Sequence, residues 1–163
     1  IAQCLVGSEM CIRDRVLYYA NLRFSKMTGG RYEIVRGESR DKRISAGLEI
    51  SVRDNFNNKE RDISSLSGGE SFQASLALAL GLSDIIQQRN GGIRLDSIFI
   101  DEGFGSLDND SLASAIETLN DLTGNGNRLV GIISHISELK NSIGNKIEVV
   151  GTKSGSSIKI ITD

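Results

Sequence analysis

The chain has 163 residues, of which 39% are hydrophobic and 25% charged, and its formal net charge is −2. This length supports one domain with a real core, and the composition is that of an ordinary globular protein. The longest apolar stretch, residues 75–82, is far shorter than the roughly 20 residues that a membrane-spanning helix needs. We therefore expect no membrane segment, a cytoplasmic protein, and no free-standing nucleic-acid binder.

Charge is unevenly distributed along the chain. Residues 13–43 carry nine Lys and Arg against four Asp and Glu, whereas residues 64–127 carry two against nine. An acidic stretch that meets a polyphosphate needs a divalent cation between the two negative charges. The basic stretch could face DNA phosphates, but we prefer to interpret it as a solvated surface of mixed charge.

The first residues are expected to contribute nothing to the fold. Residues 4–15, CLVGSEMCIRDR, are similar to a translated sequencing-adapter tail, so we interpret residues 1–15 as non-native, with a genuine short leader as the alternative. Cys4 and Cys11 lie in this tail, where a disulfide would stabilise no element and no cluster of ligands suggests zinc. We interpret both as incidental thiols.

The N-terminal third predicts one helix and two strands. Apolar residues recur at helical spacing over 16–27, and the glycines of residues 28–30 then end the helix. Residues 31–35 and 48–52 are predicted to be strands, and the second alternates apolar and polar side chains as a half-buried strand does. Residues 55–60 are predicted to form a polar turn.

Residues 67–88 carry the strongest helical pattern. Ser67 is followed three positions later by Glu70, the capping box that starts a helix. The apolar residues that recur at helical spacing beyond it are Phe72, Leu76, Ala79, Leu80 and Ile86. Since Ala and Gly occupy the other positions, the pattern indicates a helix that is packed on more than one side.

The second half alternates strands with helices. The predicted elements are a strand at 97–100, a helix at 109–122, a strand at 129–133, a brief helix at 137–141, and strands at 147–150 and 157–161. The strand at 129–133 is fully apolar, as in a parallel sheet with both faces covered. The last two strands are predicted to pair as a hairpin. The alternation favours an α/β fold with a mostly parallel sheet flanked by helices.

The segment Leu66-Ser67-Gly68-Gly69-Glu70 opens the long helix. Its two glycines let the backbone approach a ligand closely, and the unpaired N–H groups with the helix dipole favour an anion. An ordinary helix cap preceded by a turn explains the same residues. The segment alone leaves both interpretations open.

Acidic and polar residues follow the two apolar strands. Asp101 and Glu102 end the first strand, at the edge where α/β folds bind ligands. An Asp there suits Mg²⁺, and the adjacent Glu can deprotonate an attacking water, although a solvated strand end is the alternative. Asp108, or Asn109, could simply cap the next helix. His135 follows the second strand, and a lone histidine is often incidental.

The order and spacing of these segments are specific when taken together. LSGGE, a helix, an apolar strand ending in DE, then SLD, a helix and a strand ending in SH resemble the signature motif, Walker B motif, D-loop and switch histidine of the ATP-binding-cassette superfamily. The runs SLSGGESFQASLALALGLSDIIQ and DEGFGSLD resemble the C-terminal end of the SbcC family of SMC-like DNA-repair ATPases. The resemblance implies the root of a coiled-coil arm at 16–30 and the C-terminal half of an ATPase head, closed by a C-terminal β-hairpin, at 31–163.

The resemblance implies ATP and Mg²⁺ as ligands. The implied cofactor-binding residues are Ser67, Gly68, Gly69, Glu70 and Asp108, the implied metal ligand is Asp101, and the implied catalytic residues are Glu102 and His135. The serine and glycines would contact the γ-phosphate of ATP held by the opposite protomer. The Asp101–Glu102 pair would act on the ATP of its own head, Asp108 would lie at the dimer interface, and His135 would sense the γ-phosphate.

The sequence contains no G-x-x-x-x-G-K-[ST] segment, which cradles the β- and γ-phosphates in such heads. We therefore expect a truncated fragment that hydrolyses no ATP alone. The implied partners are its own N-terminal Walker A lobe, a second copy across the sandwiched ATP, an SbcD-like nuclease and DNA, with no membrane. The alternatives are a head fragment of another SMC-like ATPase, of the recombination-repair or condensin type, and a non-catalytic dimerisation or DNA-binding module.

Overall fold

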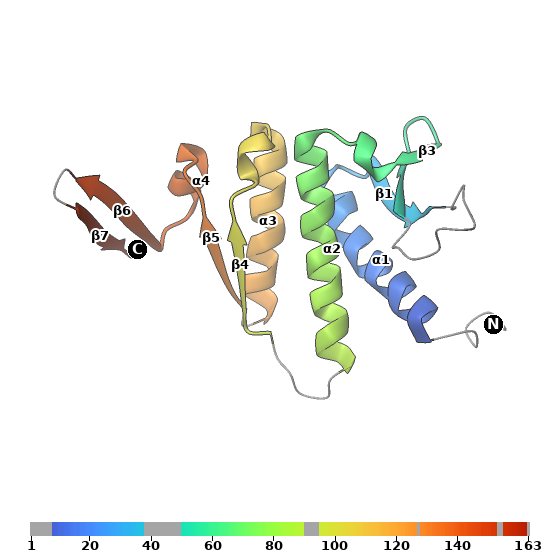
Figure 1. Ribbon diagram of the computed structural model, residues 1–163, viewed down its shortest axis with the longest axis horizontal. Coiled ribbons are helices and arrows are strands. Elements are labelled where there is room, and N and C mark those ends of the chain that lie inside the picture. The colour runs from blue at the N-terminus through green and yellow to red at the C-terminus, as the bar shows by residue number, and fades with distance from the viewer. Residues whose placement is uncertain (1–7, 38–49, 90–94, 127, 153–154, 163) are drawn as a thin grey trace.

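The computed structural model describes residues 8–37, 50–89, 95–126, 128–152 and 155–162 (Figure 1). Its helices are α1 (Ser8–Met27), α2 (Gly68–Arg89), α3 (Asn109–Gly126) and α4 (Ser137–Ser142). Its strands are β1 (Tyr32–Arg36), β2 (Ile50–Asp54), β3 (Lys59–Asp62), β4 (Ser97–Asp101), β5 (Leu129–Ile133), β6 (Lys146–Thr152) and β7 (Gly155–Ile161). Two single 3₁₀ turns, Ile63–Ser65 and Phe104–Ser106, precede α2 and α3.

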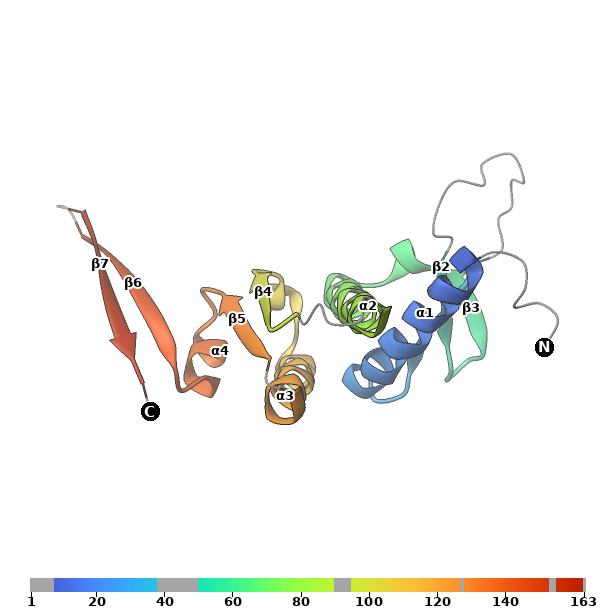
Figure 2. The same cartoon turned by 90° about the horizontal axis from the view of Figure 1, so that it is seen from below.

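Helices α1 and α2 pack against each other through small residues (Figures 1 and 2). Ala20 and Ala77 are fully buried, and a Cβ added to Gly81 would lie 2.8 Å from the Ala20 nitrogen. Helix α1 begins at Ser8 rather than at the predicted Val16, because residues 8–15 contain no glycine or proline to interrupt it. The predicted boundary was wrong by more than two turns.

Strands β1, β2 and β3 form an antiparallel sheet at one end of the molecule, with Tyr32 opposite Asp54 and Ser51 opposite Asp62. The predicted turn at 55–60 is shorter than expected, because Lys59–Asp62 form strand β3. The Asp54 carboxylate closes this turn by accepting the N–H of Phe56 at 3.0 Å. The first two residues of the strand predicted at 48–52 lie outside the described residues.

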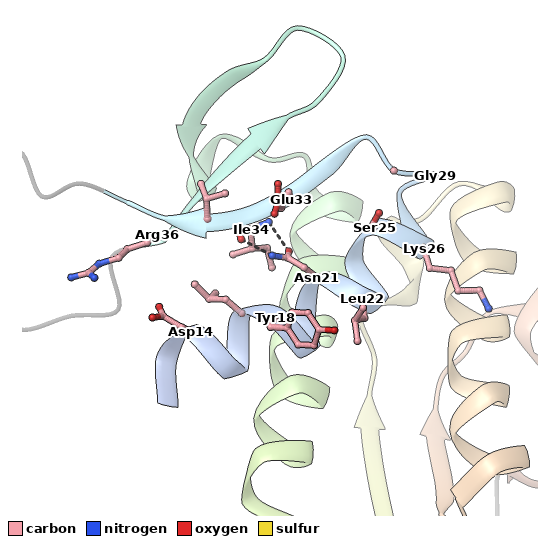
Figure 3. Close-up of a pocket in the computed structure, with 13 residues that line it drawn as sticks. Asp14, Tyr18, Asn21, Leu22, Ser25, Lys26, Gly29, Glu33, Ile34 and Arg36 are labelled. Carbon is pink, nitrogen blue, oxygen red and sulfur yellow. Dashed lines mark hydrogen bonds between the residues drawn. The ribbon is translucent and has the colours of Figure 1, made fainter. Parts of the chain in front are cut away.

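Asn21 fastens helix α1 to the edge of this sheet. Its amide nitrogen donates to the Ile34 carbonyl at 2.8 Å, and its amide oxygen accepts the Ile34 N–H at 2.8 Å (Figure 3). The side chain thus imitates a neighbouring strand and satisfies edge groups that would otherwise be unpaired. An open hollow of about 900 Å³ lies beside this contact, between α1 and β1.

Strands β4 and β5 pair in parallel, with Asp101 opposite Ile133, as the sequence predicts. One face packs on the core through Ile98, Ile100, Val130 and Ile132. The other face is open, since Phe99 is 70% exposed and Leu129 is 64% exposed. The prediction that both faces of the second strand are covered is therefore wrong for the described residues.

Strands β6 and β7 form the predicted C-terminal hairpin, which projects at the end of the molecule opposite the three-stranded sheet of β1, β2 and β3 (Figure 2). The chain as a whole has the expected α/β architecture, and its core is centred on Phe24, Ile34, Val52, Leu80 and Phe104. In the part of the chain that the structure describes, no helix is both long and apolar enough to cross a lipid bilayer.

Candidate nucleotide site

Residues 66–70, which we call the signature segment, form the predicted capping box at the start of α2. The Glu70 N–H donates to Ser67 Oγ at 3.3 Å, and the Ser67 N–H donates to Glu70 Oε2 at 2.9 Å. Ser67 and Gly68 remain exposed. The cap interpretation is confirmed, and it leaves the positive end of a 22-residue helix accessible to an anion.

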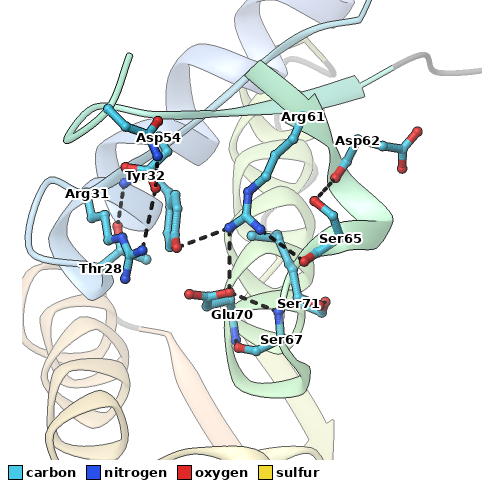
Figure 4. A network of polar contacts seen from close by, with 12 residues as sticks. Thr28, Arg31, Tyr32, Asp54, Arg61, Asp62, Ser65, Ser67, Glu70 and Ser71 are labelled. Carbon is cyan, nitrogen blue, oxygen red and sulfur yellow. Dashed lines mark hydrogen bonds and ion pairs between the residues drawn. The ribbon is translucent and has the colours of Figure 1, made fainter. Parts of the chain in front are cut away.

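Arg61 of the three-stranded sheet approaches the Glu70 carboxylate, and Tyr32 of the same sheet holds Arg61 (Figure 4). Arg61 Nη2 lies 4.0 Å from Glu70 Oε2 and donates to the Tyr32 hydroxyl at 3.1 Å. Partial burial opposes ionisation of Glu70, but hydrogen bonds from Ser67 and Tyr32 and the Arg61 charge together outweigh it. They hold the pKa of this carboxyl below its ordinary value.

This lowered pKa makes the contribution of Glu70 to stability dependent on pH. The unfolded chain binds the proton more tightly, so the contribution is complete above pH 4.5 and is lost as the pH falls through the folded-state pKa. We expect the difference in unfolding free energy between wild type and Glu70→Gln to shrink below pH 4.5. Urea unfolding from about pH 7 to pH 3 measures it, and a difference that stays constant would contradict this account.

The signature segment packs directly on residues 106–108, which we call the D-loop. A Cβ added to Gly69 would lie 2.8 Å from the Ser106 carbonyl oxygen and 3.3 Å from Leu107 Cδ2. Asp108 accepts the Ser111 N–H at 2.8 Å and so caps α3, a hydrogen bond that lowers the pKa of Asp108. The prediction that Asp108 caps the next helix is therefore confirmed.

The close approach of Gly69 to the Ser106 backbone predicts that position 69 accepts no larger side chain. Gly69→Ala should destabilise the fold by about 1–3 kcal/mol, because the new methyl group meets backbone rather than a flexible side chain. Gly124→Ala in α3 is the matched control, since a Cβ there meets nothing within 4 Å. Alanine favours the helix, so the control should stabilise the fold slightly. Urea unfolding compares the two, and equal effects would exclude the clash.

A cleft of about 380 Å³ opens beside the signature segment and the D-loop. Its lining residues come from the end of α1, the following turn and the start of β1, from the signature segment, from the D-loop and from the start of α3. Among them are Thr28, Arg31, Tyr32, Ser67, Gly69, Glu70, Asp108 and Ser111. Asp101, Glu102 and His135 do not line it. The structure therefore divides the predicted site residues into two groups.

The second group lies where β4 and β5 end. The Glu102 N–H donates to the Ile133 carbonyl at 3.0 Å, and Glu102 adopts a left-handed φ of 60° that turns the chain away from the strand. His135 Nδ1 lies 3.2 Å from Glu102 Oε1. The His135 side chain is 80% exposed and the Glu102 side chain is 53% exposed, so the pair is open to solvent.

Helix α2 connects the two groups. Phe72, one turn into the helix, packs edge-on against Phe104 with ring centroids 4.8 Å apart. It also covers Gly103, which has a φ of 97° and where a Cβ would collide with the Phe72 ring. The turn that follows Glu102 is thus held against the helix that begins at the signature segment.

Asp101 offers an oxygen ligand at the exposed end of β4. Among the described residues, no group of three or more His, Cys, Asp or Glu could hold a metal ion by itself. Mg²⁺ commonly takes one or two carboxylates and completes its octahedron with water and substrate phosphates. A single exposed aspartate suits an ion of this kind, which takes most of its ligands from water and phosphate, and does not suit a metal site built from protein ligands alone.

Sequence reasoning missed Tyr32 and Arg61. They are 29 positions apart and meet only because β1 and β3 flank β2 in one sheet. The one available cue was the position of Arg61 shortly before the signature segment. Periodicity alone does not predict which side chain reaches which carboxylate.

A protein-family model described as SbcC/RAD50-like, Walker B motif, matches residues 38–121. The chain is 53% identical over 150 residues to the SbcC subunit of the nuclease SbcCD from Vibrio cholerae serotype O1, covering 91% of this chain and 15% of that protein. It is 56% identical over 140 residues to the protein of the same name from Staphylococcus epidermidis, covering 86% and 14%.

The fold is similar to the solved SMC head domain from Thermotoga maritima, with a TM-score of 0.63 at 21% identity, covering 92% of this chain and 48% of that one. At this identity the likeness shows the fold alone. The chain spans about one seventh of the length of the curated relatives it matches. On the family model and these identities, the chain belongs to the SbcC/RAD50-like family.

Proposed function

We propose that the chain acts as the C-terminal half of an ATPase head and takes part in two ATP sites. It contributes Asp101, Glu102 and His135, which we call the strand-end group, to the ATP of its own head. It contributes the signature segment to the ATP of a second head. The observation that carries this proposal is the Glu102–His135 contact of 3.2 Å at two adjacent parallel strand ends. A carboxylate and an imidazole held together at this edge suit the activation of a water.

At the strand ends, Asp101 would hold a magnesium ion, which when bound would neutralise phosphate charge. Glu102 would orient the attacking water and accept its proton. His135 Nδ1 lies within hydrogen-bond distance of the Glu102 carboxylate and would hold it in place, and the His135 ring would also face the terminal phosphate. The exposure of both side chains supports a role toward a ligand rather than in the core.

The signature segment would meet the terminal phosphate of ATP bound by a second head. The exposed Ser67 hydroxyl and the N-terminus of α2 supply donors for an anion, and Gly68 and Gly69 permit close approach of the backbone. Asp108 lines the same cleft and would lie at the interface between the heads. Two copies would therefore enclose two ATP molecules.

An N-terminal lobe with the phosphate-binding loop would cover the open apolar surface. Phe99 and Leu129 on β4 and β5, with Ile147, Val149, Ile158 and Ile160 on the hairpin, are each more than 60% exposed. Exposed apolar side chains in this number favour a permanent partner. We also propose that Tyr18 and Leu22, exposed four positions apart on α1, meet the second helix of a coiled-coil arm.

The curated relatives are named as components of a nuclease, which supports a nuclease partner of the SbcD type and DNA as the substrate of the complex. ATP-driven pairing of heads would then control the access of DNA ends to that nuclease. A condensin-type head is less favoured, because the likeness to SMC heads is in fold at low identity. A non-catalytic module would have no use for the Glu102–His135 pair.

A complementation experiment tests this proposal. The chain alone should show no ATP hydrolysis, and addition of a matching N-terminal half with a phosphate-binding loop should restore it. Hydrolysis by the chain alone would contradict the split site. Absence of hydrolysis in the complemented pair, although both halves associate, would favour the non-catalytic module.

A further inference from the structure

Ser67, Arg61 and Tyr32 come together around the Glu70 carboxylate from three separate parts of the chain (Figure 4). The Ser67 N–H donates to it at 2.9 Å, Arg61 of β3 approaches to 4.0 Å, and the Tyr32 hydroxyl of β1 accepts an Arg61 N–H at 3.1 Å. Arg61 is itself fixed, because Nη1 donates to the Ser65 carbonyl at 3.1 Å. The carboxylate therefore has a defined position.

Tyr32 anchors this arrangement in the core. It is 2% exposed, and its ring stacks on Phe24 of α1 with centroids 6.3 Å apart. The guanidinium groups of Arg31 and Arg61 lie over the ring at 4.7 Å and 5.3 Å from its centroid. A tyrosine fixed in this way keeps its hydroxyl at one place, at the wall of the cleft that Ser67 also lines.

We propose that Tyr32 and Arg61 are positioning residues of the signature segment, which hold the Glu70 carboxylate so that Ser67 faces a phosphate bound by a second head. This inference rests on the proposed function, since it concerns the same signature site. The chain of contacts is short: the Tyr32 hydroxyl holds the Arg61 guanidinium, Arg61 pairs with Glu70, Glu70 accepts the Ser67 N–H, and the Ser67 hydroxyl in turn accepts the Glu70 N–H.

The arrangement contributes more to position than to stability. The Arg61 side chain is 36% exposed and the Glu70 side chain 25% exposed, so their ion pair at 4.0 Å contributes little to the free energy of unfolding. Tyr32→Phe keeps the buried ring and removes only the hydroxyl. A defect in this variant would therefore arise from the hydroxyl contacts rather than from the core.

The test uses the chain complemented with its N-terminal half and heads with two different affinity tags, so that mixed pairs can be isolated. One head of each pair carries Glu102→Gln, so only the ATP bound by the other head is hydrolysed. That ATP contacts the signature segment of the Glu102→Gln head. Tyr32→Phe is placed either in the Glu102→Gln head or in the hydrolysing head. ATP turnover is measured at saturating ATP, and the concentration of heads is kept above the dissociation constant of the pair.

We expect turnover to fall roughly tenfold when Tyr32→Phe is in the Glu102→Gln head, and to change less than about twofold when it is in the hydrolysing head. Arg61→Gln should give the same asymmetry. Arg53→Gln, whose ion pairs are with Glu33 and Glu60, is the matched control and should change neither arrangement.

Equal losses in both arrangements would show a general effect on the head and overturn the inference, as would full turnover in both. These outcomes leave the proposed function intact, because the pair without Tyr32→Phe still hydrolyses ATP. If that reference pair has no turnover, the proposed function itself fails, and the inference fails with it.

Discussion

Replacing Glu102 by Gln should lower ATP turnover of the complemented head by roughly a hundredfold or more, while ATP-driven pairing of heads persists. Glutamine keeps the size of the side chain and can still accept from His135 Nδ1, which lies 3.2 Å from Glu102 Oε1. It cannot accept a proton from water. Steady-state hydrolysis and the ATP dependence of pairing by size-exclusion chromatography measure the two effects separately.

The matched control is Glu138→Gln. Glu138 is an exposed acid in the first turn of α4, three residues beyond His135, and it has no part in the strand-end group. This variant should hydrolyse ATP at the wild-type rate. If turnover of Glu102→Gln stays within about threefold of wild type, Glu102 is not the base and the assignment of the strand-end group is wrong.

Asp84→Ala should destabilise the chain by about 3–5 kcal/mol, the largest effect on stability that we expect from a single polar residue. The Asp84 carboxylate on α2 binds Arg23 of α1 at 2.8 Å and Arg128, just before β5, at 3.1 Å. The exposed fractions of these side chains are 14%, 18% and 12% for Asp84, Arg23 and Arg128. Removing the carboxylate leaves two guanidinium charges largely buried with no counter-charge between them.

Lys26, which pairs with Glu117 and Asp121, provides the comparison. These side chains are 39%, 66% and 57% exposed, so Asp121→Ala should cost less than about 1 kcal/mol although its distance of 2.7 Å is the shorter one. Urea unfolding of both variants gives the difference. Similar values for Asp84→Ala and Asp121→Ala would show that burial does not strengthen the dependence on Asp84.

The strong local signals of the sequence predicted their structures well. Ser67 and Glu70 form the capping box, and the strands before Asp101 and Ser134 pair in parallel as their apolar character indicates. The start of α1 and strand β3 were predicted wrongly. Charged residues such as Lys59 and Glu60 have no strand preference of their own, and they form a strand because β2 offers a paired edge.

The sequence by itself determined the family and most of the elements in their order, because these depend on short-range patterns and on motif spacing, and it predicted a set of site residues. Only the tertiary structure decided which of those residues lie together. It separated the signature segment from the Glu102–His135 pair, left one face of β4 and β5 open, and brought Tyr32 and Arg61 behind Glu70. Contacts between residues far apart in sequence depend on how sheets and helices pack, and no local pattern of side chains encodes that packing.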